Sequence, residues 1–426
     1  MLIPIYKRKG DILDCGNSRG IKLTEHALKI LERVIDQRLR KLVKIHETQH
    51  GFVKGKGTVD AVFIMRQLQE KALEGNEKLY CAFVDLEKAY DRVPREIVYW
   101  CLRKKGVPER LIQIIRNTYE GSKTMVRTTC GNTEEFEVHV GLHQGSALSP
   151  LLFVIVMDVI STEVESREVW ELLYADDLVI TATTKEELQT RLMEWQRKLE
   201  CRGMKVNSDK SEVMVCRKSG DEELQIQDAN GQTLNQVKQF RYLGSVLQDR
   251  GGCEKEVKER VKSAWQKWRE VAGVVCDRRM PRRLKLKIYK TVIRPVLMYG
   301  SETWALRKRE ERMLERTEMR MLRWIMGISL RERRRNEDIR QLAEIACISE
   351  KIREARLRWF GKVMQSGEAS TIQKALDKPI SGKRSRGRQK LRWRDVVRSD
   401  LEIRGLSEED AKIKRGWRRK IKTADP

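Results

Sequence analysis

The sequence has few of the residues that build zinc-bound or secreted folds. Its nine cysteines include no C-x-x-C pair and it has only five histidines, which argues against a zinc site. The amino terminus turns basic after six residues, unlike a secretory signal. The longest apolar run, Leu151 to Met157, is too short to cross a bilayer. We therefore expect an intracellular protein, in the nucleus, the cytoplasm or both, with reduced cysteines and no membrane partner.

Acidic residues are also outnumbered. The chain has 62 Asp and Glu against 88 Lys and Arg, a formal net charge of +26 over 426 residues. Hydrophobic residues make up 40%, enough for most of the chain to fold. Such an excess in a folding chain points to a polyanionic partner, and nucleic acid is the main candidate. A basic protein that binds a membrane surface is the alternative. The segment from Lys378 on has a net charge of +10.

Hydrophobic periodicity predicts a mixed helical and extended part followed by a helical part. Residues 1–24 look extended, and residues 124–140 alternate as in a β-hairpin that turns at Gly131-Asn132. Leu79–Val84 is a continuous apolar run, typical of a strand buried on both faces. Two short strands are expected in 171–183 and another pair around 240–247. Helices are expected near 28–42, 58–72, 95–119 with a break at 106–108, 148–164, 185–202, 254–276, 281–293, 308–326 and 337–365.

Three carboxylates, Asp85, Asp176 and Asp177, stand where apolar strands end or turn. A carboxylate beside a buried strand is unfavourable unless it binds a cation or a hydrogen-bond donor. Adjacent aspartates repel each other, and a divalent ion cancels that repulsion. Mg²⁺ prefers one or two carboxylates together with substrate phosphates, so the trio favours a metal-dependent phosphoryl transfer. A lone Asp-Asp pair is, however, most often a simple hairpin turn.

Three motifs in series decide between these interpretations. They are Phe83-Val-Asp85-Leu-Glu-Lys-Ala-Tyr90-Asp91, Gly141-Leu-His-Gln-Gly-Ser-Ala-Leu-Ser-Pro150 and Tyr174-Ala-Asp-Asp177. In this order they resemble motifs A, B and C of reverse transcriptases. One Y-x-D-D is weak, whereas three motifs in order are specific. The local patterns also fit the family: an aspartate at a strand end, a Gln-Gly turn before a Ser-Pro helix, and Asp-Asp between two strands.

Further blocks extend the resemblance over nearly the whole chain and point to non-LTR (LINE-type) retrotransposons. They are Arg19-Gly-Ile-Lys-Leu23 and Gln49-His-Gly-Phe52 in the fingers, Gly203-Met-Lys-Val-Asn207-x-x-Lys210 as motif D, Phe240-Arg-Tyr-Leu-Gly244 as the primer grip, Arg294-Pro-Val-Leu-Met-Tyr-Gly-Ser-Glu-Thr-Trp304 after the thumb, and the tail from Gly382 to Trp393. Ser18 departs from the aromatic residue of many relatives. Because the chain begins inside the first fingers block, we expect either a truncated element copy or a gene-model fragment, without an endonuclease.

The resemblance implies a catalytic role for Asp85, Asp176 and Asp177. Asp85 and Asp176 would hold two Mg²⁺ ions, with Mn²⁺ as the alternative metal. Asp177 is adjacent to Asp176, and the carbonyl of Leu86 is a further candidate ligand.

The resemblance also implies a nucleotide site. Tyr90, five residues past Asp85, matches the steric gate, whose ring fills the space of a ribose 2′-hydroxyl; an ordinary half-buried tyrosine is the alternative. Gln144 and Gly145 match the motif B residues beside the incoming nucleotide, where glycine lets the backbone approach closely. Arg19 matches a clamp on the triphosphate, and Lys210 a general acid for pyrophosphate. For Arg19 and Lys210 a solvated surface charge is the alternative.

Two further groups are candidates for nucleic-acid contact. Tyr242, Leu243 and Gly244 match the primer-binding hairpin. Tryptophans among basic residues either stack on bases or belong to the core, and the segment 331–335 either faces phosphates or is simply solvated. The tryptophans concerned are Trp265, Trp268, Trp324, Trp359 and Trp393.

The fold that the resemblance implies is an α+β right-hand polymerase. Fingers and palm would occupy 1–252, a helical thumb or connection 253–330, and a basic helical C-terminal extension 331–426. The implied activity is RNA-directed DNA synthesis, with an RNA template, a DNA primer or target and deoxynucleoside triphosphates as partners; the oligomeric state stays open. Two alternatives remain. A group II intron maturase-like polymerase is disfavoured by the block 294–304, and a decayed or domesticated nucleic-acid-binding remnant would keep only the binding.

Overall fold

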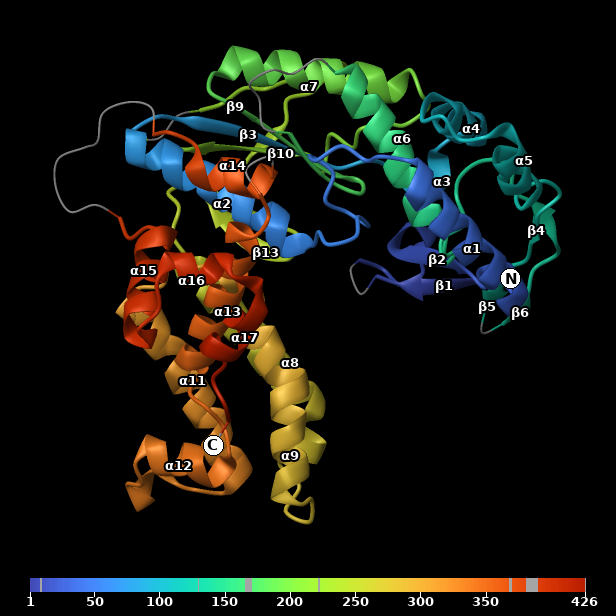
Figure 1. The fold of residues 1–426 in the computed structure, drawn as a ribbon. Coiled ribbons are helices and arrows are strands. Elements are labelled where there is room, and N and C mark those ends of the chain that lie inside the picture. Colours follow the sequence, from blue (N-terminus) through green and yellow to red (C-terminus); the bar gives the residue numbers. More distant parts are fainter. Residues whose placement is uncertain are drawn as a thin grey trace. The chain divides into compact units, whose positions relative to one another are not determined.

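The computed structural model describes residues 1–7, 10–128, 130–164, 171–220, 223–367, 370–380 and 390–425. The chain forms two compact units (Figure 1). The first consists of Met1–Thr58, Tyr80–Met214 and Glu222–Val237, and the second of Val59–Leu79, Val215–Asp221 and Lys238–Pro426. The units are therefore interleaved in the sequence, since residues 59–79 belong to the second.

A five-stranded sheet of order β11-β10-β3-β9-β8 forms the centre of the first unit. Strand β3 (Leu79–Val84) pairs antiparallel with β9 (Asp177–Ala182), which pairs antiparallel with β8 (Glu171–Tyr174). Strand β10 (Glu212–Cys216) runs parallel to β11 (Asn235–Gln236). All six residues of β3 are buried, as its continuous apolar run predicts for a strand covered on both faces.

Helices and small two-stranded sheets complete the first unit. Strands β1 (Leu2–Tyr6) and β2 (Ser18–Lys22) pair antiparallel, where the sequence indicated only extended chain, with the short helix η1 (Cys15–Asn17) between them. The apolar segment 151–160 is buried within α6, and α7 packs on β9. The helices are α1 (His26–Leu42), α3 (Ala89–Arg92), α4 (Arg95–Lys104), α5 (Glu109–Asn117), α6 (Ser149–Glu163) and α7 (Lys185–Glu200).

The hairpin expected at 124–140 differs in its turn. Gly131–Asn132 is not the turn but a strand, β6, which pairs with β5 (Arg127–Thr128). Outside this pair, β4 (Lys123–Thr124) pairs with β7 (Phe136–Glu137). The hydroxyl of Thr128 accepts a hydrogen bond from Cys130 N–H at 3.2 Å and donates to Gly131 O at 3.0 Å. This side chain stabilises a reversal before Gly131, which the Gly-Asn pattern did not predict.

The second unit is largely helical. Strands β12 (Gln239–Tyr242) and β13 (Ser245–Gln248) form its hairpin. Its helices and turns are α2 (Thr58–Gly75), α8 (Glu254–Val275), α9 (Arg282–Ile288), η2 (Tyr289–Ile293), α10 (Arg294–Met298), η3 (Ser301–Thr303), α11 (Lys308–Met326), η4 (Leu330–Glu332), α12 (Asn336–Ala343), α13 (Ile348–Met364), α14 (Thr371–Asp377), α15 (Trp393–Arg404), α16 (Glu408–Lys412) and α17 (Lys414–Ile421).

The single helix expected over 337–365 is in fact two, α12 and α13. Glu344 has φ +52°, a left-handed conformation that ends α12. The N–H of Ile345 then bonds back to Arg340 O at 3.0 Å. The change of direction places Ile345 and Ile348 in the core of the unit, where both side chains are fully buried. Burial of these two side chains outweighs the helical pattern of the sequence.

Three of the five tryptophans considered for stacking belong to the core instead. Trp268, Trp359 and Trp393 are buried. The ring of Phe63, in α2, lies 5.6 Å from that of Trp359 and 4.7 Å from that of Trp393, in edge-to-face contacts. Trp324 is exposed, and Trp265 is partly buried against the core. The tail residue Trp393 is thus part of the packing of the second unit.

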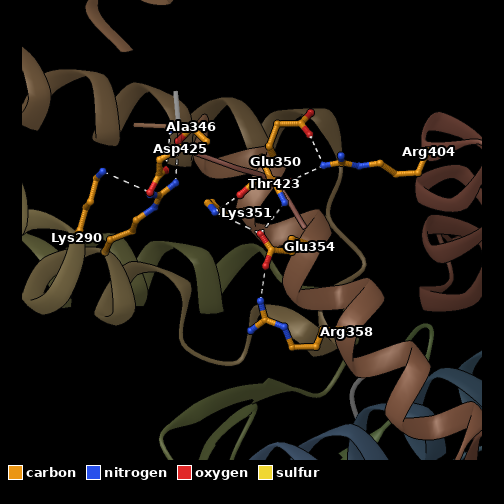
Figure 2. Close-up of polar contacts among 10 residues, drawn as sticks. Lys290, Ala346, Glu350, Lys351, Glu354, Arg358, Arg404, Thr423 and Asp425 are labelled. Carbon is orange, nitrogen blue, oxygen red and sulfur yellow. Dashed lines mark hydrogen bonds and ion pairs between the residues drawn. The ribbon is translucent and has the colours of Figure 1, made fainter. Parts of the chain in front are cut away.

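Polar contacts hold residues 423–425 against the second unit (Figure 2). Asp425 accepts a hydrogen bond from Ala346 N–H at 3.0 Å and pairs with Lys290 at 3.3 Å. The N–H of Thr423 donates to Glu354 at 3.1 Å. The end of the basic extension is therefore anchored by its own acidic and polar residues.

Candidate active site

The pairing of β3 with β9 brings the three aspartates to one edge of the sheet. Asp85 directly follows β3, whose last residue, Val84, is paired with Leu178. Asp177 precedes Leu178 and opens β9, and Asp176 lies in the turn before it. The pairing of β3 with β9 thus brings Asp85 and Asp176, which are 91 residues apart in the sequence, to the same end of the sheet, as the three motifs predicted.

The turn that carries Asp176 is tighter than the sequence suggested. Tyr174 and Asp177 are paired, so the turn consists of Ala175 and Asp176 alone, and Asp177 belongs to the strand. Ala175 has φ +58°, a left-handed conformation that is unusual for a residue with a side chain. Such a conformation persists only where the surroundings impose it.

Segment 48–51 imposes that conformation. Leu173 N–H donates to Thr48 O at 3.1 Å, and His50 N–H donates to Leu173 O at 2.7 Å. The side-chain oxygen of Gln49, which is fully buried, accepts from Ala175 N–H at 3.2 Å. A Cβ on Gly51 would overlap the backbone nitrogen of Ala175, so only glycine allows this close approach. The Gln-His-Gly block therefore supports the Asp176 turn, a role that sequence reasoning missed.

The carboxylates repel one another and are partly shielded from water. Burial, followed by the charges of Asp176 and Asp85, raises the pKa of Asp177 to about 6. Burial likewise raises the pKa of Asp85 and of Asp176, with Lys210 and Arg19 respectively opposing the shift. A cation bound near these carboxylates would stabilise their ionised forms and so lower their pKa values.

The donor set suits a divalent cation. No three carboxylate, imidazole or thiol side chains of the described residues are grouped closely enough to hold a metal ion by themselves. Mg²⁺ does not need such a group, since it commonly takes one or two carboxylates and completes its shell with water and substrate phosphates. Asp85 and Asp176 therefore fit the ion as carboxylate ligands.

Residues 205–211 hold the backbone around Asp85. Asn207 N–H donates to Asp85 O at 2.8 Å, and Asp85 N–H donates to the hydroxyl of Ser211 at 3.2 Å. Leu86 is paired with Val206. The ammonium of Lys210 lies 3.8 Å from the Asp85 carboxylate, and its side chain is 69% exposed. In this arrangement Lys210 offsets the charge of Asp85.

Tyr90 lies close to the Asp176 carboxylate. Its ring stacks on that of Phe153 with 4.5 Å between centroids and 20° between planes. Burial and the charge of Asp176 raise the pKa of Tyr90. Its hydroxyl is buried and has no hydrogen-bond partner among the described residues. Stacking on Phe153 thus fixes the ring beside the carboxylates without a contribution from the hydroxyl.

The motif B loop is tied to motif A and to β2. The Gln144 amide donates to Asp91 at 2.8 Å, and Lys22 N–H donates to Gln144 O at 2.7 Å. Gly145 has φ +110°, and a Cβ there would lie 2.5 Å from Lys22 O. The close approach that requires glycine is thus to the backbone of Lys22. Asp91 and Lys22 are further site residues that the motif comparison did not single out.

Arg19 and the expected primer hairpin belong to different units. Arg19 is exposed on β2 in the first unit, and its charge lowers the pKa of Asp176 against the effect of burial. Leu243 and Gly244, with φ +46° and +80°, form the tip of the β12–β13 hairpin in the second unit. Tyr242 is buried, and Tyr299 donates to Leu243 O at 2.8 Å. The Tyr242 ring is therefore covered, whereas the tip residues Leu243 and Gly244 are half-buried.

The family model "Reverse transcriptase (RNA-dependent DNA polymerase)" matches residues 5–247, more than half of the chain. The chain belongs to the reverse transcriptase family. The match spans motifs A to D, so the resemblance seen in the sequence and the expected α+β fold class are both confirmed. Reverse transcriptases generally use divalent metal ions, in keeping with the donor set.

Relatives of this reverse transcriptase include proteins of mobile elements. It is 30% identical over 200 residues to the Retrovirus-related Pol polyprotein from type-2 retrotransposable element R2DM of Drosophila melanogaster, covering 45% of this chain and 19% of that protein. It is 24% identical over 322 residues to the RNA-directed DNA polymerase from mobile element jockey of the same organism, covering 72% and 35%. The chain thus spans about a fifth and about a third of the length of these two relatives. They confirm the resemblance to reverse transcriptases of non-LTR retrotransposons.

Solved structures of telomerase also match. The telomerase of Candida albicans, in complex with a fragment of telomeric RNA, is 11% identical with a TM-score of 0.38, covering 83% of this chain and 57% of that one. Within the described residues, none of the helices has the length and apolar character needed to span a membrane.

Proposed function

We propose that the chain is an RNA-directed DNA polymerase, which adds deoxynucleotides to the 3′-hydroxyl of a primer on an RNA template. The observation that carries the proposal is the edge of the sheet where Asp85 meets the Asp176–Asp177 turn. Family membership supports it. A non-LTR retrotransposon is the source that the relatives favour.

In the proposed reaction, the primer 3′-hydroxyl loses its proton to solvent, its oxygen forms a bond to the α-phosphorus of a deoxynucleoside triphosphate, and the bond from that phosphorus to pyrophosphate breaks. Asp85 and Asp176, with the Leu86 carbonyl, would hold two Mg²⁺ or Mn²⁺ ions, which supply activation of the hydroxyl and charge neutralisation for the leaving group. The carboxylate of Asp177 adds to the negative potential that attracts cations. Lys210 would give its proton to the departing pyrophosphate.

Four residues would select and hold the nucleotide. The Tyr90 ring, fixed against Phe153, would exclude a ribose 2′-hydroxyl. Gln144, oriented by Asp91, and the Gly145 backbone would line the place of the incoming nucleotide. The exposed guanidinium of Arg19 would pair with triphosphate oxygens. Most of the rate enhancement would then come from positioning and electrostatics.

The partners follow from this reaction. An RNA template and a DNA primer or target would bind through the excess of basic residues in the chain. The turn Leu243–Gly244, next to Tyr242, would contact the primer. The charge excess of the chain supports a polyanionic partner of this kind. Deoxynucleoside triphosphates complete the set.

The experiment is primer extension by the purified full chain with a radiolabelled DNA primer. An RNA template and a DNA template of the same sequence are compared, with Mg²⁺ or Mn²⁺ and with a chelator. We expect template-directed products on RNA that disappear with the chelator. Nucleic-acid binding without extension under any of these conditions would overturn the proposal in favour of a remnant that only binds.

A further inference from the structure

The end of α11 carries an exposed tryptophan. Trp324 is 66% exposed, and it is the one exposed tryptophan among the residues that the structure describes. Leu330, in the following turn η4, is 79% exposed. Exposure of large apolar side chains is unfavourable in water, so one at the end of α11 and another in the turn that follows suggest a contact that the second unit does not itself provide.

An arginine-rich loop is bonded to the end of the helix that carries this tryptophan. The guanidinium of Arg323, the neighbour of Trp324, donates to Arg334 O at 2.9 Å and to the side chain of Asn336 at 3.3 Å. The loop between α11 and α12 therefore folds back on the last turn of α11 (Figure 1). Ser329 caps η4 by accepting from Arg331 N–H at 3.1 Å. The loop is thus ordered by its own contacts.

Three guanidinium groups of this loop are available for a ligand. In the described part of the chain, no hydrogen bond or ion pair engages the side chains of Arg331, Arg333 and Arg335, and all three residues are exposed. Arg333 is held at φ +49°.

The acidic neighbours only partly compensate this charge. Glu332 accepts from Ser329 N–H at 2.8 Å and lies 3.3 Å from Arg334. Glu337 lies 4.0 Å from Arg340, and Asp338 follows it in the first turn of α12. Residues 323–340 keep a net charge of +3. Arginines that are free of internal partners can form charge-assisted bonds to phosphate.

We propose that Trp324, Arg331, Arg333 and Arg335 form a binding site for single-stranded RNA. An exposed indole can stack on an unpaired base, while guanidinium groups bind the phosphates on either side. A duplex offers phosphates but no free base face, and an acidic protein would use the arginines without needing the indole. In the proposed polymerase, this site would bind the unpaired part of the RNA template. Only the identification of the bound strand as the template rests on the proposed function.

The test compares two RNA probes on the full chain by fluorescence anisotropy. One is an unstructured labelled RNA of about 12 nucleotides, within the range of common single-strand sites, and the other is a blunt duplex of equal length. We expect Trp324→Ala to weaken single-strand binding about fivefold or more and to leave duplex binding unchanged. Trp324→Phe, which keeps an aromatic ring, should retain most of the affinity.

A matched triple variant separates this site from general basic charge. Arg331→Ala/Arg333→Ala/Arg335→Ala should weaken binding and lower the salt slope for single strands by up to about 2. Arg278→Ala/Arg279→Ala/Arg282→Ala removes the same charge from exposed positions in the α8–α9 connection and at the first residue of α9, where none of the described tryptophans is exposed. We expect this control to affect both probes alike and by less than the first triple variant.

Equal affinity of Trp324→Ala and the unmodified chain for single strands would overturn the proposal, as would an equal loss on both probes. Thermal melting checks that each variant is folded. The anisotropy assay measures RNA binding without catalysis. Its result therefore tests the site even if the chain fails to extend primers.

Discussion

The side-chain oxygen of Gln49 accepts a hydrogen bond from the N–H of Ala175 at 3.2 Å, directly before Asp176. Gln49 is fully buried, and its neighbour Gly51 lies so close to Ala175 that no side chain fits there. Ala175 keeps a left-handed conformation in this setting. The link joins residues 126 positions apart, and it determines where the Asp176 carboxylate stands relative to Asp85.

We predict that Gln49→Ala lowers kcat of primer extension by ~10- to 100-fold with little change in KM, because a small displacement of a catalytic carboxylate is costly while substrate contacts stay in place. Gly51→Ala should act in the same way through steric overlap. Gly273→Ala, in α8 where a Cβ meets no other atom, is the matched control with full activity. Unchanged kcat in folded Gln49→Ala protein would show that the turn holds its conformation without the buttress.

Tyr90→Val should raise ribonucleotide incorporation relative to deoxyribonucleotide incorporation. Removal of the ring opens the space beside Asp176 that a 2′-hydroxyl would occupy. Tyr90→Phe is the control, since the hydroxyl that it removes has no hydrogen-bond partner among the described residues and the stack on Phe153 is kept. Competition between the two sugar types measures the effect. Equal discrimination by all three proteins would exclude Tyr90 as the gate.

The raised pKa of Asp177 predicts a pH-dependent cost to folding. Because the pKa of this carboxyl is about 6, above its usual value, the folded state favours the protonated form. Stability should therefore fall as pH rises from about 4 to above 6. Without divalent ions, Asp177→Asn should melt slightly higher than the unmodified chain at pH 8, and solvent screening reduces the effect because the carboxylate is only partly shielded from water.

The two proteins should melt alike at a pH of about 2.5, well below the pKa of about 3.9 of an unfolded aspartate, because the carboxyl is then protonated in both states. The melting temperatures of Asp177→Asn and the unmodified chain are compared at both pH values in the presence of a chelator. A lower melting temperature for Asp177→Asn at pH 8 would contradict the electrostatic account.

Trp393→Ala should reduce the free energy of unfolding of the second unit by about 3–5 kcal/mol, because the ring is 1% exposed and packs on Phe63 at 4.7 Å. Trp324→Ala, at a side chain that is 66% exposed, should change it by less than about 0.5 kcal/mol. Denaturant titration of both variants measures the difference. Similar losses would mean that the two tryptophans are buried to a similar degree in solution.

Features that depend on neighbouring residues were predictable from the sequence. The strand Leu79–Val84, the two strands around Tyr174-Ala-Asp-Asp177 and the apolar α6 follow from continuous hydrophobic runs. The aspartates at the strand ends followed as well, because an isolated carboxylate there needs a functional reason. The family match confirmed the motifs that these elements carry.

Features that depend on distant partners were not predictable. The turn before Gly131 depends on the Thr128 hydroxyl, and the break at Glu344 on burial of Ile345 and Ile348. The Gln49–Ala175 bond joins segments that no local pattern connects. Gly51 marks a place where two backbones can approach closely, but its partner, Ala175, is identified only by the fold.

The measurement that tests the central claim most directly is extension by Asp176→Asn. Single-turnover extension and RNA–DNA binding are measured on the unmodified chain, Asp176→Asn and the surface control Glu186→Gln, which makes the same charge change on exposed α7. We predict that Asp176→Asn loses extension while its affinity for primer–template stays within a few-fold, and that Glu186→Gln keeps both. Extension by Asp176→Asn at a near wild-type rate would contradict the assignment of catalysis to the Asp85–Asp176 edge.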